Sequence, residues 1–234
     1  MLAHIQGVLS AEEVASIRSV LEGTDWVDGR VSAGPQGAAV KNNLQVPEDS
    51  PQGRALSQRV IDALIRSPVF GAAAFPARIA PPLFNRYDVG MEYGSHVDGA
   101  IRTYRSPDPG VGMGARHYRT DLSATLFLTS PDDYDGGELI IETAYGVHAV
   151  KLPAGDLILY PSVSRHRVEP VTRGSRWASF MWMQSLIRSD SHRNTLFEMD
   201  MALQELDKKV GAKDQTLVTL TGIYHNLVRM WSEV

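Results

Sequence analysis

Two residues that commonly bind iron lie two positions apart, at His96 and Asp98 in the stretch YGSHVDGAIR. On a β-strand, residues i and i+2 point to the same face, so one strand end would direct an imidazole and a carboxylate toward one ion. Iron sites that activate O₂ use two histidines and one carboxylate on one face of the metal. Seven histidines and sixteen aspartates in 234 residues, however, give an H-x-D tripeptide by chance about half of the time. The pair alone does not distinguish a metal site from a turn in which Asp98 caps a backbone amide.

A histidine on a distant strand would complete such a site. His166 follows the strand-like stretch GDLILYP and begins another, HRVEPV, so it is the predicted third ligand. It also lies between Arg165 and Arg167, where a surface histidine is the alternative.

The arginine that opens the stretch RWASFMWM predicts a second binding role. Arg176 would be buried among aromatic residues, where a guanidinium is unfavourable unless an anion neutralises it. Its planar fork matches the distal carboxylate of 2-oxoglutarate, a keto acid that chelates iron through its other end. A surface ion pair with Glu169 across a hairpin is the alternative, and it would contribute little to stability.

Two further side chains lie close to these residues in the sequence. Tyr87, in FNRYDVG, could bind 2-oxoglutarate through its hydroxyl or pack in the core. His117 lies in the segment after Asp98 and could contact a substrate. The stretch YDGGEL lacks the spacing of a phosphate-binding loop and predicts a turn. The other histidines have no partner at ligand spacing: His4, His148, His192 and His225.

The composition limits the kinds of site that the chain can build. With 43% hydrophobic and 21% charged residues it is typical of a globular protein, and its net charge of −4 gives no reason to expect nucleic acid as the partner. No cysteine is present, which excludes disulfides, zinc ribbons, iron–sulfur clusters and thiol nucleophiles. The sequence has no secretory signal and no apolar run long enough to span a membrane, so we expect a cytoplasmic protein.

The elements that must position these residues change in type along the chain. A capping box at Ser10 predicts a helix over residues 11–22, and Ser50-Pro51 predicts a second helix that ends near Ser67. The Gly-rich stretch between them predicts short strands or an extended loop. From residue 78 onward, short β-rich stretches follow at intervals of 8–12 residues, which predicts an antiparallel sandwich or barrel.

Two amphipathic helices follow Ser189 and meet near Gly211. Their apolar residues are spaced three and four apart, which predicts a helical hairpin with one apolar stripe on each arm. These stripes need burial against the barrel or a second subunit, and we expect a homodimer through the C-terminal helices. The stripes are Leu196, Met199, Leu203, Leu206 and Val210, then Leu217, Leu220, Tyr224, Leu227 and Trp231.

Four stretches closely resemble the bacterial PKHD-type hydroxylases: HVDGAIR, DLSATLFLTSPDDYDGGEL, VKLPAGDLILYPSVSRHRVEPVTRGSRWASFMWMQSLIR and LFEMDMALQEL. These are Fe(II)- and 2-oxoglutarate-dependent dioxygenases of the prolyl-hydroxylase-like superfamily, often linked with iron uptake. The resemblance covers nearly the whole chain. It implies that His96, Asp98 and His166 bind iron, that Arg176 binds 2-oxoglutarate, and that ascorbate keeps the iron reduced. It also implies a double-stranded β-helix (jelly roll).

We therefore expect an α+β protein with N-terminal helices, a jelly-roll core and a C-terminal helical hairpin. The dioxygenase domain would cover residues 1–188, with its catalytic core over about 78–188, and the hairpin would cover 189–234. The reaction would hydroxylate an unactivated C–H bond with O₂ and 2-oxoglutarate, releasing succinate and CO₂. A jelly-roll sensor that binds iron or 2-oxoglutarate without turnover is the alternative, and a cupin-like enzyme that uses zinc or manganese is a third hypothesis.

Residues 99–120 form a long connection beside the predicted iron site. This segment is positively charged although the whole chain is acidic, because the stretch GAIRTYRSPDPGVGMGARHYRT contains four arginines and one aspartate. Arg102 and Arg116, with His117, are therefore predicted to recognise an anionic substrate. A solvated loop whose arginines pair with surface acids is the alternative.

Overall fold

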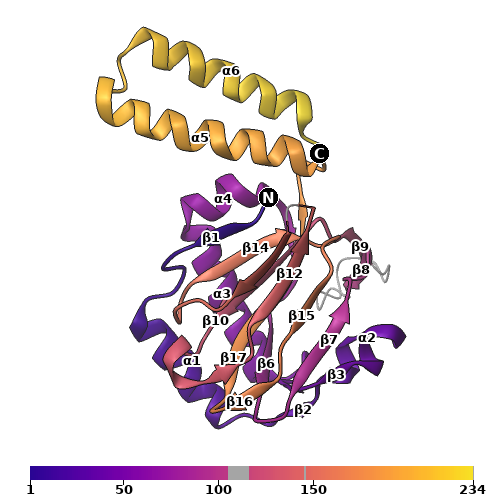
Figure 1. Ribbon diagram of the computed structural model, residues 1–234. Helices are drawn as coiled ribbons and strands as arrows, with labels where there is room; N and C mark the ends of the chain where they lie inside the picture. Colours follow the sequence, from indigo (N-terminus) through magenta and orange to yellow (C-terminus); the bar gives the residue numbers. More distant parts are fainter. Residues whose placement is uncertain (105–115, 145, 234) are drawn as a thin grey trace.

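The strand-rich middle of the chain folds into two antiparallel sheets that face each other as a jelly roll (Figure 1). This computed structural model describes residues 1–104, 116–144 and 146–233. The larger sheet has the strand order β1 (Ala3–Ile5), β14 (Leu157–Pro161), β10 (Leu122–Phe127), β17 (Arg176–Ser185), β6 (Leu83–Tyr87), β4 (Leu44–Gln45) and β2 (Val27–Asp28), and β5 (Pro76–Ile79) also pairs with β17. The smaller sheet has the order β13 (Gly146–Val150), β12 (Leu139–Thr143), β15 (His166–Val168), β7 (Glu92–His96) and β3 (Lys41–Asn42). Two short ladders pair β11 (Asp135–Gly136) with β16 (Val171–Arg173), and β8 (Ile101–Tyr104) with β9 (Arg116–Arg119).

Strand β10 shows how the larger sheet is buried on both faces. Its residues Leu122, Ala124 and Leu126 belong to an apolar cluster with the N-terminal helices. Ser123 and Thr125 alternate with them and point to the opposite face, toward the smaller sheet. The helices that cover the outer face are α1 (Ala11–Glu22), α3 (Pro51–Arg66) and α4 (Pro68–Ala74). The inner face is therefore free to line a cavity between the sheets.

The two helices predicted near the N-terminus are confirmed. Helix α1 begins with the predicted capping box, because Ser10 Oγ accepts from the Glu13 amide at 3.1 Å and Glu13 Oε2 accepts from the Ser10 amide at 2.9 Å. Helix α3 begins at Pro51 with Ser50 as its N-cap. None of the helices in the described part of the chain is long and apolar enough to cross a membrane.

Three segments differ from the sequence prediction. Residues 68–74 form α4, a short helix capped by Ser67 and held by the burial of Phe70. The segment between α1 and α3 contains short strands as expected, but also the 3₁₀ helix η1 (Gly29–Ser32) and α2 (Pro35–Ala39). The connection 99–120 is not wholly a loop, because its two ends pair as β8 and β9, and its middle lies outside the described residues. A further 3₁₀ turn, η2, covers Pro131–Asp133.

The C-terminal helices α5 (Asp190–Val210) and α6 (Gln215–Trp231) form the predicted hairpin, which projects from one end of the jelly roll beside α4 (Figure 1). The hairpin is attached at the start of α5, where buried Arg193 donates to the carbonyls of Ile187 at 2.7 Å and Arg188 at 2.9 Å. Only Leu196 and Leu217 of the predicted stripes are fully buried among the described residues. The two helices contact each other, and the other stripe residues are half-buried or exposed.

The stretch YDGGEL, predicted as a turn, instead contains the two-residue strand β11, and two consecutive glycines there are left-handed, with φ of 70° at Gly136 and 65° at Gly137. A side chain at Gly136 would also place its Cβ 2.1 Å from the Pro170 carbonyl oxygen. Gly90 has a similar φ of 85°, but a Cβ there would meet no atom within 4 Å. An alanine at Gly90 would introduce backbone strain alone, whereas an alanine at Gly136 would introduce both backbone strain and a steric clash.

We expect Gly90→Ala to lower the free energy of unfolding by roughly 1–2 kcal/mol, the cost of left-handed backbone in an L-residue. Gly136→Ala should lower it by about 3 kcal/mol or more, because the Pro170 carbonyl must also move. Denaturant unfolding of the two variants measures the difference. Equal losses would contradict the close approach at Gly136.

Candidate functional site

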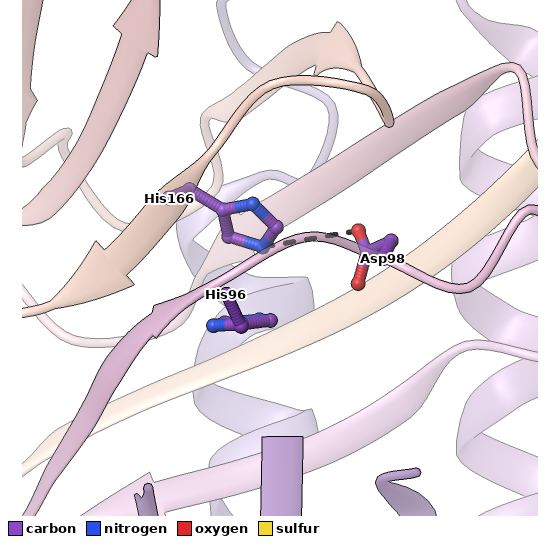
Figure 2. A group of neighbouring side chains, drawn as sticks. All are labelled: His96, Asp98 and His166. Carbon is purple, nitrogen blue, oxygen red and sulfur yellow. Dashed lines mark ion pairs between the residues drawn. The ribbon is translucent and has the colours of Figure 1, made fainter. Parts of the chain in front are cut away.

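His96, Asp98 and His166 come together in the smaller sheet. His96 ends β7, and His166 begins β15 directly opposite it in the antiparallel pairing. Asp98 lies two residues beyond His96, and its Oδ2 is 3.8 Å from His166 Nε2 (Figure 2). One ligand atom from each residue lies within 4.8 Å of the other two, as a single metal ion requires. The strand pairing thus brings together the three residues that the sequence singled out.

Both histidines are oriented by backbone carbonyls. His96 Nδ1 lies 2.9 Å from the Gly94 oxygen, and His166 Nδ1 lies 3.0 Å from the Ser164 oxygen. A carbonyl only accepts hydrogen bonds, so each Nδ1 carries the proton and each Nε2 keeps a lone pair for a metal. Burial and the neighbouring His166 lower the pKa of His96 to about 4, which keeps this imidazole neutral at physiological pH.

The carboxylate has its own support, which sequence reasoning missed. Ser123 Oγ donates to Asp98 Oδ2 at 2.6 Å, and Ser162 Oγ lies 2.7 Å from Ser123 Oγ. The ring of Tyr93 stacks on His96 with 3.7 Å between the ring centres. Serines and tyrosines are too common for the sequence to single these out, because their role depends on the pairing of distant strands.

The three residues lie in the wall of a cavity of about 550 Å³ between the two sheets. Arg176, at the start of β17, lines the same cavity and is only 1% exposed. Its Nε and Nη1 have no hydrogen-bond partner in the described part of the chain. A buried guanidinium without a neutralising carboxylate is unfavourable, so this group is suited to receive an anion inside the cavity.

The surface alternatives for Arg176 and His166 are wrong. Glu169 pairs with Arg167 at 2.7 Å rather than with Arg176, and His166 is only 6% exposed although both of its neighbours are arginines.

Tyr87 lies directly opposite Arg176 on the neighbouring strand β6. Its ring centre is 5.4 Å from the guanidinium carbon, and the ring of Phe127 lies at 5.1 Å. Burial raises the pKa of Tyr87 to about 12, so the phenol stays neutral and can donate a hydrogen bond. Tyr87 lines the cavity and belongs to the apolar core as well, so the two predicted roles are compatible.

Of the three residues predicted to contact a substrate, one lines the cavity in the described part of the chain. Arg102 lines it and is half-buried, with its guanidinium carbon 3.7 Å from the centre of the Trp182 ring. His117 is exposed and lies 3.1 Å from Thr103 Oγ1, and it is not among the described residues that line the cavity. The side chain of Arg116 lies outside the described residues. A buried lysine, Lys41, lines the cavity without any signal in the sequence.

Comparisons with known proteins agree with this geometry. Residues 82–184 match the family model of the 2OG-Fe(II) oxygenase superfamily, and residues 190–233 match the PKHD-type hydroxylase C-terminal domain. The chain is 55% identical to a PKHD-type hydroxylase of Beijerinckia indica and 52% identical to one of Methylobacterium nodulans, with 100% of both chains covered in each case.

Solved structures share the fold at low sequence identity. A prolyl hydroxylase from Trichoplax adhaerens, in complex with a hypoxia inducible factor peptide fragment, is 14% identical with a TM-score of 0.53 and covers 83% of this chain and 86% of its own. HygX from Streptomyces hygroscopicus, with nickel, 2-oxoglutarate and hygromycin B bound, is 18% identical with a TM-score of 0.52 and covers 79% of this chain and 82% of its own. Because its curated relatives are more than half identical over their whole length, the chain belongs to the PKHD-type hydroxylases, enzymes of the 2OG-Fe(II) oxygenase superfamily.

Proposed function

We propose that this protein hydroxylates an unactivated C–H bond with O₂ and 2-oxoglutarate, which is converted to succinate and CO₂. His96, Asp98 and His166 hold Fe(II), and Arg176 holds the distal carboxylate of 2-oxoglutarate. The observation that carries this proposal is the buried Arg176, whose Nε and Nη1 lack a partner among the described residues, in the same cavity as the His–Asp–His group.

The donor set suits Fe(II). Two imidazole nitrogens and one carboxylate oxygen on one side of an ion leave its other positions open for a keto acid and O₂. Hydrogen bonds to Gly94, Ser164 and Ser123 fix the orientation of the three side chains before an ion binds.

The apolar surroundings of Arg176 suit the co-substrate. The rings of Tyr87 and Phe127 lie close to the guanidinium, so a carboxylate there would be bound in a medium of low dielectric. Nε and Nη1 have no hydrogen-bond partner in the part of the chain that the structure describes, and Tyr87 can add a neutral hydroxyl from the adjacent strand.

Iron, when bound with 2-oxoglutarate and O₂, supplies the oxidising chemistry that inserts one oxygen atom into the C–H bond. The chain contributes position and exclusion of water. Ser123 holds the Asp98 carboxylate, Tyr93 supports the His96 ring, and Arg176 fixes the far end of the co-substrate. Ascorbate is proposed as the reductant that restores Fe(II) after turnover without substrate.

Residues 1–188 are proposed as the catalytic unit and 189–234 as a separate helical hairpin, in a protein that works in the cytoplasm. The hairpin is also the proposed site of self-association, because α6 carries exposed apolar side chains: Val218 at 52%, Ile223 at 47% and Met230 at 74%.

Metal affinity should fall in a graded series. His166→Ala and Asp98→Ala each remove a ligand, so Mn(II) binding should weaken by more than the roughly 10–100-fold expected when Ser123→Ala removes only the group that orients the carboxylate. His148→Ala, on β13 and away from the cavity, is the matched control. Calorimetric titration measures all four. Unchanged affinity in either ligand variant would remove that residue from the site.

Succinate release from 2-oxoglutarate, Fe(II) and ascorbate tests the function itself. Wild-type protein should release succinate, and Arg176→Lys should raise the KM for 2-oxoglutarate by about tenfold or more, because it keeps the charge but loses the bidentate fork. Arg173→Lys, an exposed arginine paired with Asp135, is the control. An unchanged KM would mean that the carboxylate is bound elsewhere. Binding of 2-oxoglutarate without any succinate would favour a sensor.

Self-association is tested by light scattering. The full chain of 25.7 kDa should behave as a dimer, and Val218→Asp with Ile223→Asp should make it monomeric, because a buried carboxylate opposes association. A monomeric wild-type protein would reject the dimer.

A further inference from the structure

Lys41 is a buried ammonium group in the wall of the cavity, and neither the metal nor 2-oxoglutarate accounts for it. The residue is 6% exposed, and its Nζ donates to Ser32 Oγ at 2.9 Å and Gln45 Oε1 at 3.2 Å. It forms no ion pair with any carboxylate in the described ranges. Lysine is almost never buried without a charged partner, so this group needs an explanation.

Arg102 is a second cation on the same side of the cavity. Its guanidinium lies over the Trp182 ring at 3.7 Å, and Lys41 Nζ lies 5.4 Å from the centre of the Phe180 ring. Those two rings touch edge to face, with 5.4 Å between their centres. Lys41 and Arg102 thus lie along two adjoining aromatic rings that point into the cavity.

The position of this pair is set by β17. Arg176, Phe180 and Trp182 are separated by even numbers of residues, so all three point to the inner face of the sheet. Arg176 lies at one end of that row, and the two rings that carry the cations lie toward the other. The pair is therefore distinct from the proposed 2-oxoglutarate site.

Lys41 is also close to the metal group. It is paired in register with Tyr93, and its Nζ lies 5.2 Å from the Tyr93 ring centre. His96 stacks on the same ring, with 3.7 Å between the ring centres. One tyrosine ring therefore separates Lys41 from a residue that could bind iron, so a molecule held by Lys41 would lie beside the reacting centre.

The charges of the cavity favour an anion there. Among the described lining residues, Asp98 is the one carboxylate, against the three cations Lys41, Arg102 and Arg176. Because Fe²⁺ and the 2-oxoglutarate dianion cancel, the loaded cavity keeps an excess of two positive charges. Burial and the charge of Arg102 lower the pKa of Lys41 to about 8, so the ammonium is destabilised until an anion binds next to it.

We infer that Lys41 and Arg102 bind a carboxylate of the molecule that is hydroxylated, and that this molecule is small. The inference rests on the proposed function, which supplies the reaction. A cavity of about 550 Å³ has the size of a small-molecule site, and two cations with aromatic walls suit a carboxylate attached to an apolar body.

The pair keeps one residue of the predicted arginine cluster, Arg102, and adds Lys41, whereas the side chain of Arg116 lies outside the described residues. Arg119, on β9, is occupied by Asp121 at 2.6 Å and also pairs with Glu233 at 3.3 Å. Arg102 alone of the described arginines in this segment lines the cavity, and its partner there is a lysine from a distant strand.

The test uses a bacterial metabolite extract, freed of macromolecules by filtration and divided on an anion-exchange resin. Each fraction is added to the wild-type enzyme with Fe(II), ascorbate and 2-oxoglutarate, and succinate release is compared with the rate of the same protein without extract. The retained, anionic fraction should stimulate release, and treatment of that fraction with a phosphatase should leave the stimulation intact.

Lys41→Met and Arg102→Gln should each weaken that stimulation by about tenfold or more, the loss expected for a charge-assisted hydrogen bond, whereas Lys41→Arg should retain most of it. Lys213→Met, at the exposed turn between α5 and α6, is the control. Arg102 is half-buried, so its variant remains informative if the Lys41 variants fail to fold. The retained fraction should also raise the melting temperature of the metal-free wild-type protein but not of Arg102→Gln, a readout that needs no turnover.

Stimulation by the unretained fraction alone, by the macromolecules alone or by no fraction would overturn the inference, as would stimulation that persists in both neutral variants or disappears after phosphatase treatment. Failure of the proposed function looks different, because the wild-type enzyme would then release no succinate under any condition.

Discussion

A buried guanidinium with two nitrogens that lack a partner among the described residues is the constraint on which the rest of the site depends. Arg176 lies near the rings of Tyr87 and Phe127, and its Nε and Nη1 have no hydrogen-bond partner among the residues that the structure describes. A guanidinium in such a position is costly until an anion neutralises it. The jelly roll holds the Arg176 side chain in place, since Arg176 lies on a central strand of the larger sheet between β10 and β6. Under the proposed function, this energetic penalty is relieved when the carboxylate of 2-oxoglutarate binds.

The His–Asp–His group depends on the register of the smaller sheet. His96 and His166 are direct partners of β7 and β15, so their imidazoles lie on one face of that sheet with ring centres 4.2 Å apart. A shift of one residue would turn one imidazole to the opposite face. The larger sheet then contributes Ser123, which holds Asp98 from across the cavity. Both sheets therefore contribute to the site: the smaller sheet supplies the two imidazoles, and the larger sheet supplies Ser123, which binds the Asp98 carboxylate, and Arg176.

Local patterns predicted what depends on local geometry. The H-x-D spacing, a histidine at a strand start and an arginine in an aromatic strand located the four central residues, and the caps located α1 and α3. Lys41 could not be predicted, because its burial depends on the pairing of a two-residue strand, β3, with β7. Helix α4 is too short for a periodic signal and is stabilised by tertiary burial of Phe70. The β8–β9 pairing was hidden by the Gly- and Pro-rich stretch that separates its strands.

A crystal structure of the protein with Mn(II) and 2-oxoglutarate, grown without O₂, tests the central claim most directly. The account predicts the ion between the Nε2 atoms of His96 and His166 and an oxygen of Asp98, with the distal carboxylate of 2-oxoglutarate on Arg176. The cations Lys41 and Arg102 should not touch the co-substrate. An ion bound elsewhere, or a distal carboxylate that lies on Lys41 or Arg102 while Arg176 stays unpaired, would contradict the account.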